Sequence, residues 1–202
     1  MELEFKEFSK IYRLNREVII TEKIDGTNAQ IFIGENGEFL TGSRTQWIAP
    51  ENDNHGFSKW AHENKEELLK LGNGRHFGEW WGSGIQRGYG LPKGEKRFSL
   101  FNVQRWCLDG DTPKRIIMAD PRIEKYQDIL PKFCGLVPVI ARGLFTTELC
   151  SQALENLKHA GSLASPGFMK PEGIVIYHTQ GNFGLKVTFE KDEQPKSLNT
   201  NQ

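Results

Sequence analysis

This 202-residue chain lacks several features that would narrow the class of protein at once. Charge of one sign is not in excess, because 26 lysines and arginines balance 26 aspartates and glutamates. A neutral chain has no overall field that attracts it to nucleic acid or membrane, so any polyanion site must be a local patch. No apolar run approaches the roughly 20 residues of a spanning helix, and the amino terminus is mixed in charge. We therefore expect no membrane segment and no signal peptide.

Cysteine is also scarce. Cys107, Cys134 and Cys150 are odd in number, widely separated, and without the paired spacing of a structural zinc site. They predict free thiols in a reducing compartment. We expect a soluble, monomeric, intracellular protein, either cytoplasmic or virus-encoded and acting inside a host cell.

Most of the hydrophobic runs are short and bounded by turn residues, which predicts a β-rich first half. Asn36-Gly37 is a hairpin signal between two such runs. A helix is expected from Phe57 to Leu71, and residues 82–97 form a glycine-rich, basic segment that we expect to be a mobile loop. The expected strands of this half span 18–21, 29–33, 38–41, 77–82 and 98–103.

The second half gives weaker signals before it returns to strands. We expect a short helix over 122–130 and an edge strand over 137–140, because proline is tolerated at sheet edges. Thr146 or Thr147 caps a helix that Gly161 closes. A hairpin of strands 172–177 and 183–189 follows, and residues 190–202 form a polar tail.

Charged residues interrupt or border these apolar strands, although an unpaired buried ion costs several kcal/mol. Each could lie on a solvated face when taken alone. Together they can form a cleft in which cations grip a polyphosphate and carboxylates hold Mg²⁺. They are Glu22 with Lys23, Arg44, Glu79, Glu172 and Lys186.

The order of these residues resembles the covalent nucleotidyltransferases, which include ATP-dependent RNA and DNA ligases and mRNA capping enzymes. Glu22, Thr27 and Asn28 make the resemblance strongest to RNA ligases that seal nicks or breaks in structured RNA, and Gly84-Ile85-Gln86 supports it. The matching elements are Lys23-Ile24-Asp25-Gly26, Ser43-Arg44, Phe77-Gly78-Glu79, Phe98-Ser99-Leu100-Phe101, Glu172-Gly173-Ile174-Val175 and Leu185-Lys186.

The resemblance implies an α+β fold of antiparallel sheets with flanking helices, as in a nucleotidyltransferase or ATP-grasp-like ligase adenylation domain. It also implies that Lys23 attacks the α-phosphate of ATP to form lysyl-AMP, from which AMP passes to an RNA 5′-phosphate and is then displaced by a 3′-hydroxyl. An unperturbed lysine is protonated at pH 7, so its setting must favour the free amine. Lys186 is expected to do so by like-charge repulsion and to contact the α-phosphate.

Further roles follow from the same resemblance. Asp25 and Asn28 position the lysine and the ribose or acceptor phosphate, with an Asx turn beside Gly26 as the alternative for Asp25. Glu172 holds the metal, Mg²⁺ or Mn²⁺, through water. The remaining ATP contacts are assigned to Glu22 at the adenine edge, Arg44 at ribose or phosphate, Glu79 at the ribose hydroxyls and Phe98 stacked on adenine.

Several alternatives stay open. Phe98 could be an ordinary core residue, and a basic loop is usually only solvated, although Arg87, Lys93, Lys96 and Arg97 are candidates for RNA contacts. Family members commonly carry a second lysine where this chain has Thr188.

The chain is expected to be one adenylation domain over 1–202, without an appended C-terminal domain. The resemblance then favours an ATP-dependent RNA ligase in RNA repair. The alternatives are a DNA ligase or GTP-using transferase, and a nucleotide-binding or RNA-end-binding module with weakened catalysis.

Overall fold

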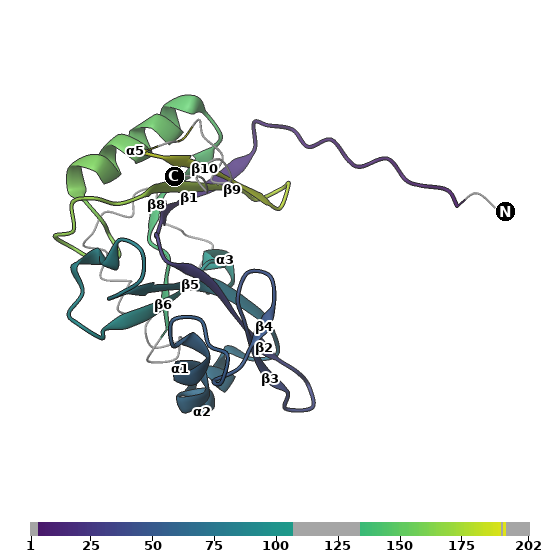
Figure 1. Cartoon of the computed structure of the whole chain (residues 1–202). Helices are drawn as coiled ribbons and strands as arrows, with labels where there is room; N and C mark the ends of the chain where they lie inside the picture. Colours follow the sequence, from purple (N-terminus) through teal and green to yellow (C-terminus); the bar gives the residue numbers. More distant parts are fainter. Residues whose placement is uncertain (1–3, 107–133, 191, 193–202) are drawn as a thin grey trace, which may run out of the picture.

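The computed structural model describes residues 4–106, 134–190 and 192, and it has an α+β architecture of two sheets with flanking helices (Figure 1). One sheet has four antiparallel strands in the order β10-β9-β1-β8. Helix α5 (Thr147–Ala160) packs against it. The four strands are β1 (Glu17–Lys23), β8 (Val139–Leu144), β9 (Gly173–His178) and β10 (Phe183–Thr188).

The other sheet has six strands in the order β4-β3-β2-β5-β6-β7, and only β6 and β7 pair in parallel. The strands are β2 (Thr27–Ile33), β3 (Phe39–Gly42), β4 (Trp47–Ile48), β5 (Gly74–Gly82), β6 (Lys96–Leu100) and β7 (Cys134–Leu136). The short helices are α1 (Phe57–Glu63), α2 (Lys65–Leu68), the 3₁₀ turns η1 (Leu69–Leu71) and η2 (Gly88–Gly90), and α3 (Val103–Trp106).

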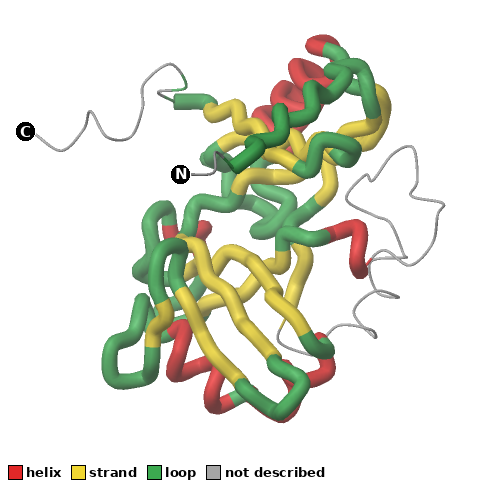
Figure 2. The backbone as a smooth tube through the Cα atoms, turned by 90° about the vertical axis from the view of Figure 1, so that its right-hand side faces the viewer, coloured by secondary structure: helices red, strands yellow, loops and turns green. Residues whose placement is uncertain are grey.

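Alternation along the strands of the six-stranded sheet divides it into two different faces. One face packs on α1, α2 and η1 through a core that includes Ile31, Phe57, Trp80 and Phe98. The opposite, outer face carries none of these helices, which lie behind the strands in Figure 2. The strands therefore have a stabilising face and a face that is available for function.

The chain passes from one sheet to the other between β1 and β2, at Ile24, Asp25 and Gly26. A Cβ atom on Gly26 would lie 2.4 Å from the carbonyl oxygen of Trp80, so only glycine allows the backbone this close to β5. Lys23 is the last residue of β1 and consequently lies at the junction of the two sheets.

Most of the expected elements are confirmed. The strands over 18–21, 29–33, 38–41 and 77–82 lie in β1, β2, β3 and β5, and the C-terminal hairpin is formed by β9 and β10. Helix α5 begins where expected, because the Thr146 hydroxyl accepts a hydrogen bond from the Leu149 amide at 3.0 Å. Trp80 and Trp81 are both buried.

Four expectations are corrected. The helix expected over 57–71 breaks at Asn64, whose side-chain amide donates to the Trp60 carbonyl and ends α1. The strand expected over 98–103 ends at Leu100, and the edge strand β8 begins at Val139, after Pro138. The segment 82–97 is packed, with Ile85 and Tyr89 buried. The helix expected over 122–130 lies outside the described residues.

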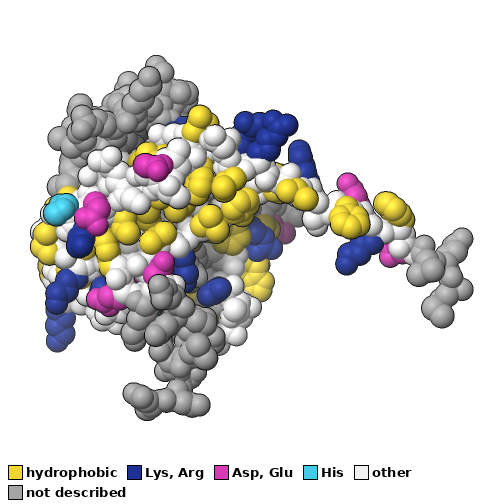
Figure 3. Space-filling view, turned by 90° about the horizontal axis from the view of Figure 1, so that it is seen from above, with side chains coloured by type: hydrophobic (Ala, Val, Ile, Leu, Met, Phe, Trp, Pro, Cys, Tyr) yellow, Lys and Arg dark blue, Asp and Glu magenta, His cyan; other side chains and the backbone are white. Residues whose placement is uncertain are grey.

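Residues 4–14 have no regular secondary structure and project from the body with exposed hydrophobic and charged side chains (Figure 3). Cys134 and Cys150, the cysteines within the described ranges, are free thiols. No helix in the described part of the chain is long and apolar enough to cross a membrane.

Candidate active site

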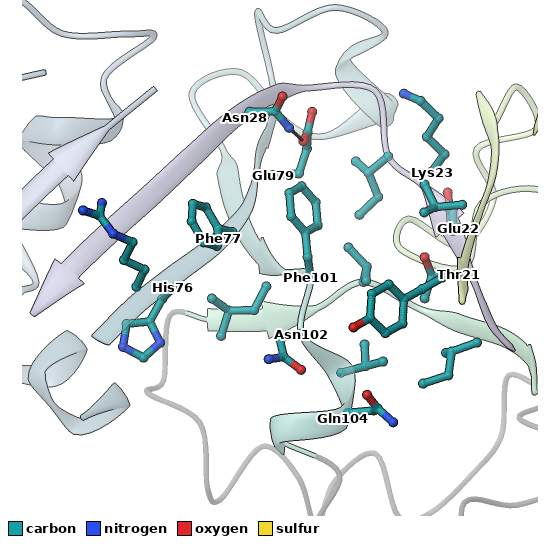
Figure 4. Close-up of a pocket in the computed structure, with 18 of the residues that line it drawn as sticks. Thr21, Glu22, Lys23, Asn28, His76, Phe77, Glu79, Phe101, Asn102 and Gln104 are labelled. Carbon is teal, nitrogen blue, oxygen red and sulfur yellow. Dashed lines mark hydrogen bonds between the residues drawn. The ribbon is translucent and has the colours of Figure 1, made fainter. Parts of the chain in front are cut away.

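A pocket of about 450 Å³ lies between the two sheets, with side chains from both around it. In Figure 4, Phe77 and Phe101 project into it, Glu79 and Asn28 lie beside each other, and Lys23 lies near Glu22 at its edge. The four-stranded sheet supplies Thr21, Lys23, Val175 and Tyr177, whereas the six-stranded sheet and the segment after it supply Asn28, Phe77, Glu79 and Phe101. The pocket thus combines aromatic, amide, carboxylate and ammonium groups.

Lys23 forms an ion pair with Glu172 at this edge. The lysine Nζ donates to Glu172 Oε2 at 2.5 Å, and the side chains are 19 % and 7 % exposed. The pairing follows from strand register, because Lys23 lies opposite Gly173 in the β1–β9 ladder. A Cβ atom at Gly173, where φ is 153°, would lie 2.1 Å from the Val187 carbonyl oxygen, so glycine is required there.

Glu79 is buried on the outer face of the six-stranded sheet, opposite Asn28. Its carboxylate accepts hydrogen bonds at 3.0 Å from the Gly26 amide and from the Asn28 side chain. Burial raises the pKa of Glu79 to about 7, although these hydrogen bonds and the nearby Lys23 charge oppose the shift. The carboxylate therefore holds the turn after Lys23 and keeps Asn28 oriented toward the pocket.

Asp25 is held from the opposite side by the segment between β5 and β6. Its Oδ2 accepts from Arg87 Nε at 3.1 Å, and its amide donates to the Tyr89 hydroxyl at 2.8 Å. Arg87 also donates to the Lys170 carbonyl at 3.3 Å and to the Glu190 carboxylate at 3.4 Å. The Arg87 guanidinium consequently links three segments: the turn after Lys23, the loop before Glu172 and the residues that follow β10.

Glu22 is almost completely buried, and its carboxylate is occupied by the loop after α5. Oε1 accepts from the Ser162 hydroxyl at 2.6 Å, while Oε2 accepts from the amides of Leu163 and Ala164 at 2.8 and 2.9 Å. Burial raises the pKa of Glu22, and these hydrogen bonds counteract the rise. The side chain therefore anchors the end of β1 to this loop, while the Glu22 amide donates to the Pro138 carbonyl at 2.8 Å.

Strand register brings Lys186 to the same face as the pocket. Lys186 lies opposite Val175, which lies opposite Thr21, and directly opposed residues in antiparallel strands share a face. Thr188 lies in the row of Gly173 and Lys23. Its hydroxyl donates to the Glu190 carbonyl at 3.0 Å, so this position carries no cation beside Lys23.

Phe98 is not part of the pocket. It is fully buried, and its ring packs against those of Phe57 and Trp60 on the helix-covered face. The expectation that Phe98 stacks on adenine does not fit this position, since no base can reach the ring. Phe101, which is 40 % exposed, lines the pocket instead, and its amide donates to the Phe77 carbonyl at 2.9 Å.

The sequence analysis did not place Phe101 in the pocket, although a signal was available. Ser99 lies opposite Glu79 in the β5–β6 ladder, so it shares the outer face. Counting two residues onward from Ser99 leads to Phe101, whereas Phe98 and Leu100 belong to the opposite face. Phe101 is therefore on the same face as Glu79, whereas Phe98 is on the opposite face.

Comparison with known proteins agrees with this geometry. The family model described as RNA ligase matches residues 16–190, which include every element of the pocket. The chain belongs to the RNA ligase family. No curated protein sequence matches the chain.

Solved structures of Naegleria gruberi RNA ligase share the fold. A mutant of that ligase with ATP and Mn has a TM-score of 0.60 and 20 % identity, covering 91 % of this chain and 53 % of the other. A second mutant, also with ATP and Mn, has a TM-score of 0.59 and 19 % identity, covering 86 % of this chain and 49 % of the other. The complex of that ligase with PPi has a TM-score of 0.56 and 20 % identity, covering 86 % of this chain and 50 % of the other. The chain spans about half the length of these ligases.

The other residues expected to bind ATP or RNA are more scattered. Arg44 is exposed in the turn between β3 and β4 and does not line the pocket. Lys96 donates to the His55 carbonyl at 2.6 Å, and Arg97 pairs with Glu95 at 2.6 Å. Lys93 is exposed. None of Arg44, Arg87, Lys93, Lys96 and Arg97 lines the pocket.

The carboxylates present fit a metal that is held mainly by its nucleotide. Among the residues that the structure describes, no three histidine, cysteine, aspartate or glutamate side chains converge as a metal site. Mg²⁺ typically retains waters and binds one or two carboxylates together with substrate phosphates. Glu172, which lies beside Lys23, has the donor chemistry for such water-mediated binding.

Proposed function

We propose that this protein is an ATP-dependent RNA ligase that joins RNA 3′-hydroxyl and 5′-phosphate ends through AMP bound to Lys23. One observation carries the proposal: the Lys23 amine lies 2.5 Å from Glu172 at the edge of a pocket that also presents Glu79, Asn28 and Phe101. This combination supplies a nucleophile, a proton acceptor and groups for a nucleoside. Membership of the RNA ligase family supports the choice of reaction.

In the first step, Lys23 Nζ attacks the α-phosphorus of ATP. A nitrogen–phosphorus bond forms, the bond from that phosphorus to the bridging oxygen breaks, and pyrophosphate leaves with the electron pair. An ammonium group has no free electron pair, so the lysine must first lose a proton. Glu172 is the carboxylate within hydrogen-bonding distance that can accept it. Lys186, on the same face of the four-stranded sheet, offers an ammonium group for the phosphates of ATP.

The pocket orients the nucleotide for this attack. Phe101 offers an exposed ring for stacking on adenine, with Val175 from the other sheet facing the same pocket. Glu79 and Asn28 provide hydrogen-bonding groups for the ribose, and Asp25 is fixed beside the nucleophile by Arg87. Mg²⁺ or Mn²⁺, held by Glu172 through water and by the phosphates, would neutralise charge on the departing pyrophosphate.

The stored AMP then passes to RNA. A phosphate oxygen of the RNA 5′-end attacks the adenylate phosphorus, the bond to Lys23 breaks, and the amine leaves with a proton. The RNA 3′-hydroxyl next attacks the activated 5′-phosphate, which forms the phosphodiester and releases AMP. The substrates are therefore RNA ends or nicked duplex RNA, as RNA repair requires.

The test measures the intact mass of the protein after incubation with ATP and Mg²⁺. We expect one added AMP, no addition to Lys23→Ala, and loss of the addition when 5′-phosphorylated nicked RNA is supplied. Ligated RNA should then accumulate. Parallel reactions with GTP and with nicked DNA distinguish an RNA ligase from a GTP-using transferase or DNA ligase. Failure of ATP, GTP and every other nucleotide to form an adduct would contradict the proposal.

Thr188 favours one second candidate, a nucleotide-binding or RNA-end-binding module with weakened catalysis. The residue lies in the row of Lys23, and it supplies a hydroxyl where a cation could stabilise phosphate. This candidate predicts saturable binding of ATP without covalent transfer. Calorimetric titration with ATP beside the mass measurement separates the two.

A further inference from the structure

Two rows of side chains cross the outer face of the six-stranded sheet beyond the pocket. Strand register aligns Leu40, Phe32 and Arg75 in one row. It aligns Trp47 and Gly42 with Gln30 and Phe77 in the next. Trp47 is 45 % exposed and Phe77 is 51 % exposed, so large aromatic surfaces face outward here.

Arg75 contacts two aromatic residues of these rows. The Arg75 guanidinium lies 5.1 Å from the centre of the Phe32 ring and 5.2 Å from that of the Trp47 ring, within the range of cation–π attraction. It also donates to the side-chain oxygen Oε1 of Gln30 at 3.3 Å. We call Phe32, Trp47, Arg75 and Phe77 the aromatic platform. Neither of the two rows contains a carboxylate.

The platform is continuous with the candidate active site. Arg75 and Phe77 line the pocket as well as belonging to the platform, and Glu79 is the next outward-facing residue of β5. Helices α1 and α2 pack on the opposite face of the same sheet, and they lie behind its strands in Figure 2. A ligand on the platform would therefore lie next to a nucleotide bound in the pocket.

We propose that the aromatic platform binds an unpaired base of the RNA substrate, close to the end that is joined. This inference rests on the proposed ligase function. Flat aromatic rings bind single-stranded nucleic acid by stacking on bases, and a guanidinium can stack or contact a phosphate. The positive Arg75 and the absence of acidic residues from both rows suit an anionic strand. Arg44, exposed in the turn that leads to Trp47, adds a second cation nearby.

The chemistry of the platform explains why RNA is the chosen occupant. Exposed rings could also bind a second copy of the chain, but the Arg75 guanidinium and the lack of carboxylates in both rows complement an anionic strand. Bases present a flat ring, which matches the exposed Trp47 ring. The platform accordingly gives the enzyme affinity for a strand end without reading its sequence.

Trp47 provides the cleanest test because it belongs to the platform and does not line the pocket. The probe is a fluorescein-labelled, 5′-phosphorylated, single-stranded RNA, and the readout is fluorescence anisotropy. Stacking on one aromatic residue corresponds to about 5-fold to 160-fold in affinity, so Trp47→Ala should weaken binding by a factor in this range. Trp47→Phe should restore most of the affinity, and Trp47→Leu should not, because only phenylalanine can stack.

Phe8→Ala is the matched control, since Phe8 is 96 % exposed on the N-terminal arm. It should bind the probe as the unchanged protein does. Thermal unfolding confirms that the Trp47 variants are folded, and adenylation of Lys23 by ATP alone should be unchanged in all of them.

Unchanged RNA binding by Trp47→Ala, or full recovery with Trp47→Leu, would overturn the platform proposal while the adenylate still forms. A dimer that Trp47→Ala dissociates, detected by light scattering, would also overturn it in favour of a second copy. Absence of the adenylate in the unchanged protein would contradict the ligase function itself, so the two failures are distinguishable.

Discussion

The two faces of the six-stranded sheet use alternate residues of the same strands for different purposes. On the helix-covered face, Trp80 and Phe98 pack with Phe57 in a closed aromatic core. On the outer face, one residue before Trp80, Glu79 points toward the pocket and Asn28. Stability and binding are consequently separated by the two-residue period of a strand, so truncation of a ring on the helix-covered face should cost more stability than truncation of one on the outer face.

The largest expected effect compares the two phenylalanines near the end of β6. Phe98→Ala removes a fully buried ring and should lower the free energy of unfolding by about 3 to 5 kcal/mol. Phe101→Ala removes a ring that is 40 % exposed and should lower it by only about 1 kcal/mol, while nucleotide binding weakens. Urea unfolding and ATP titration of both variants check the contrast. Equal losses of stability would refute the separation of the two faces.

This contrast also shows what the sequence could and could not predict. The strands, the Asn36-Gly37 turn and the capped helix α5 were predictable, because their signals are local. The faces of β6 were not, since the phase of the strand depends on its pairing with β5, as Ser99 opposite Glu79 shows. The break at Asn64 was missed because the apolar spacing continues across it to Leu68.

The candidate site likewise has features that the sequence could predict and features that it could not. The order of Lys23, Glu79, Glu172 and Lys186 along the chain was enough to predict a shared cleft, and the pocket does bring Lys23 and Glu79 together. The contacts that hold them could not be predicted. Glu22 and the amide of Leu163 are 141 positions apart, so no local pattern reports their hydrogen bond.

The next effect concerns the charge of Glu79. Burial raises its pKa from 4.5 to about 7, so between these values the folded state binds more protons than the unfolded state. The free energy of unfolding therefore falls by about 3 kcal/mol as pH rises through this window. Above the window it levels off. Glu79→Gln should remove this part of the pH dependence. Unfolding in urea from pH 4.5 to pH 8 provides the comparison.

The control for this experiment is Glu95→Gln, which changes a half-exposed carboxylate outside the pocket and should retain the slope. Glu22 also has a raised pKa and remains in both variants, so the quantity to compare is the difference from the unchanged protein. Identical slopes in Glu79→Gln and the unchanged protein would show that burial does not hold Glu79 in its neutral form.

The smallest expected effect separates a positioning role of Arg87 from direct contact with RNA. Arg87→Ala frees Asp25 and should slow adenylation of Lys23 roughly tenfold without any RNA present, because misplaced groups near a nucleophile reduce its rate. Arg87→Lys should recover part of the rate, since it keeps the charge but not every hydrogen bond. Rapid-quench kinetics at saturating ATP measure the rate.

Lys93→Ala serves as the matched change in the same segment, because Lys93 is exposed and should not affect adenylation. If Arg87→Ala adenylates at the normal rate and only binds RNA more weakly, Arg87 is an RNA contact, as the sequence alone suggested. A defect in both measurements would assign it both roles.

The central claim is that Lys23, at the junction of the two sheets, is the residue that carries the nucleotide. Peptide mapping by mass spectrometry after incubation with ATP and Mg²⁺ tests this most directly, because it locates the modified side chain. AMP is expected on Lys23 alone, with no modification of Lys186, which is exposed on β10 on the same face of the four-stranded sheet. AMP on Lys186 or on any other residue, with Lys23 unmodified, would contradict it.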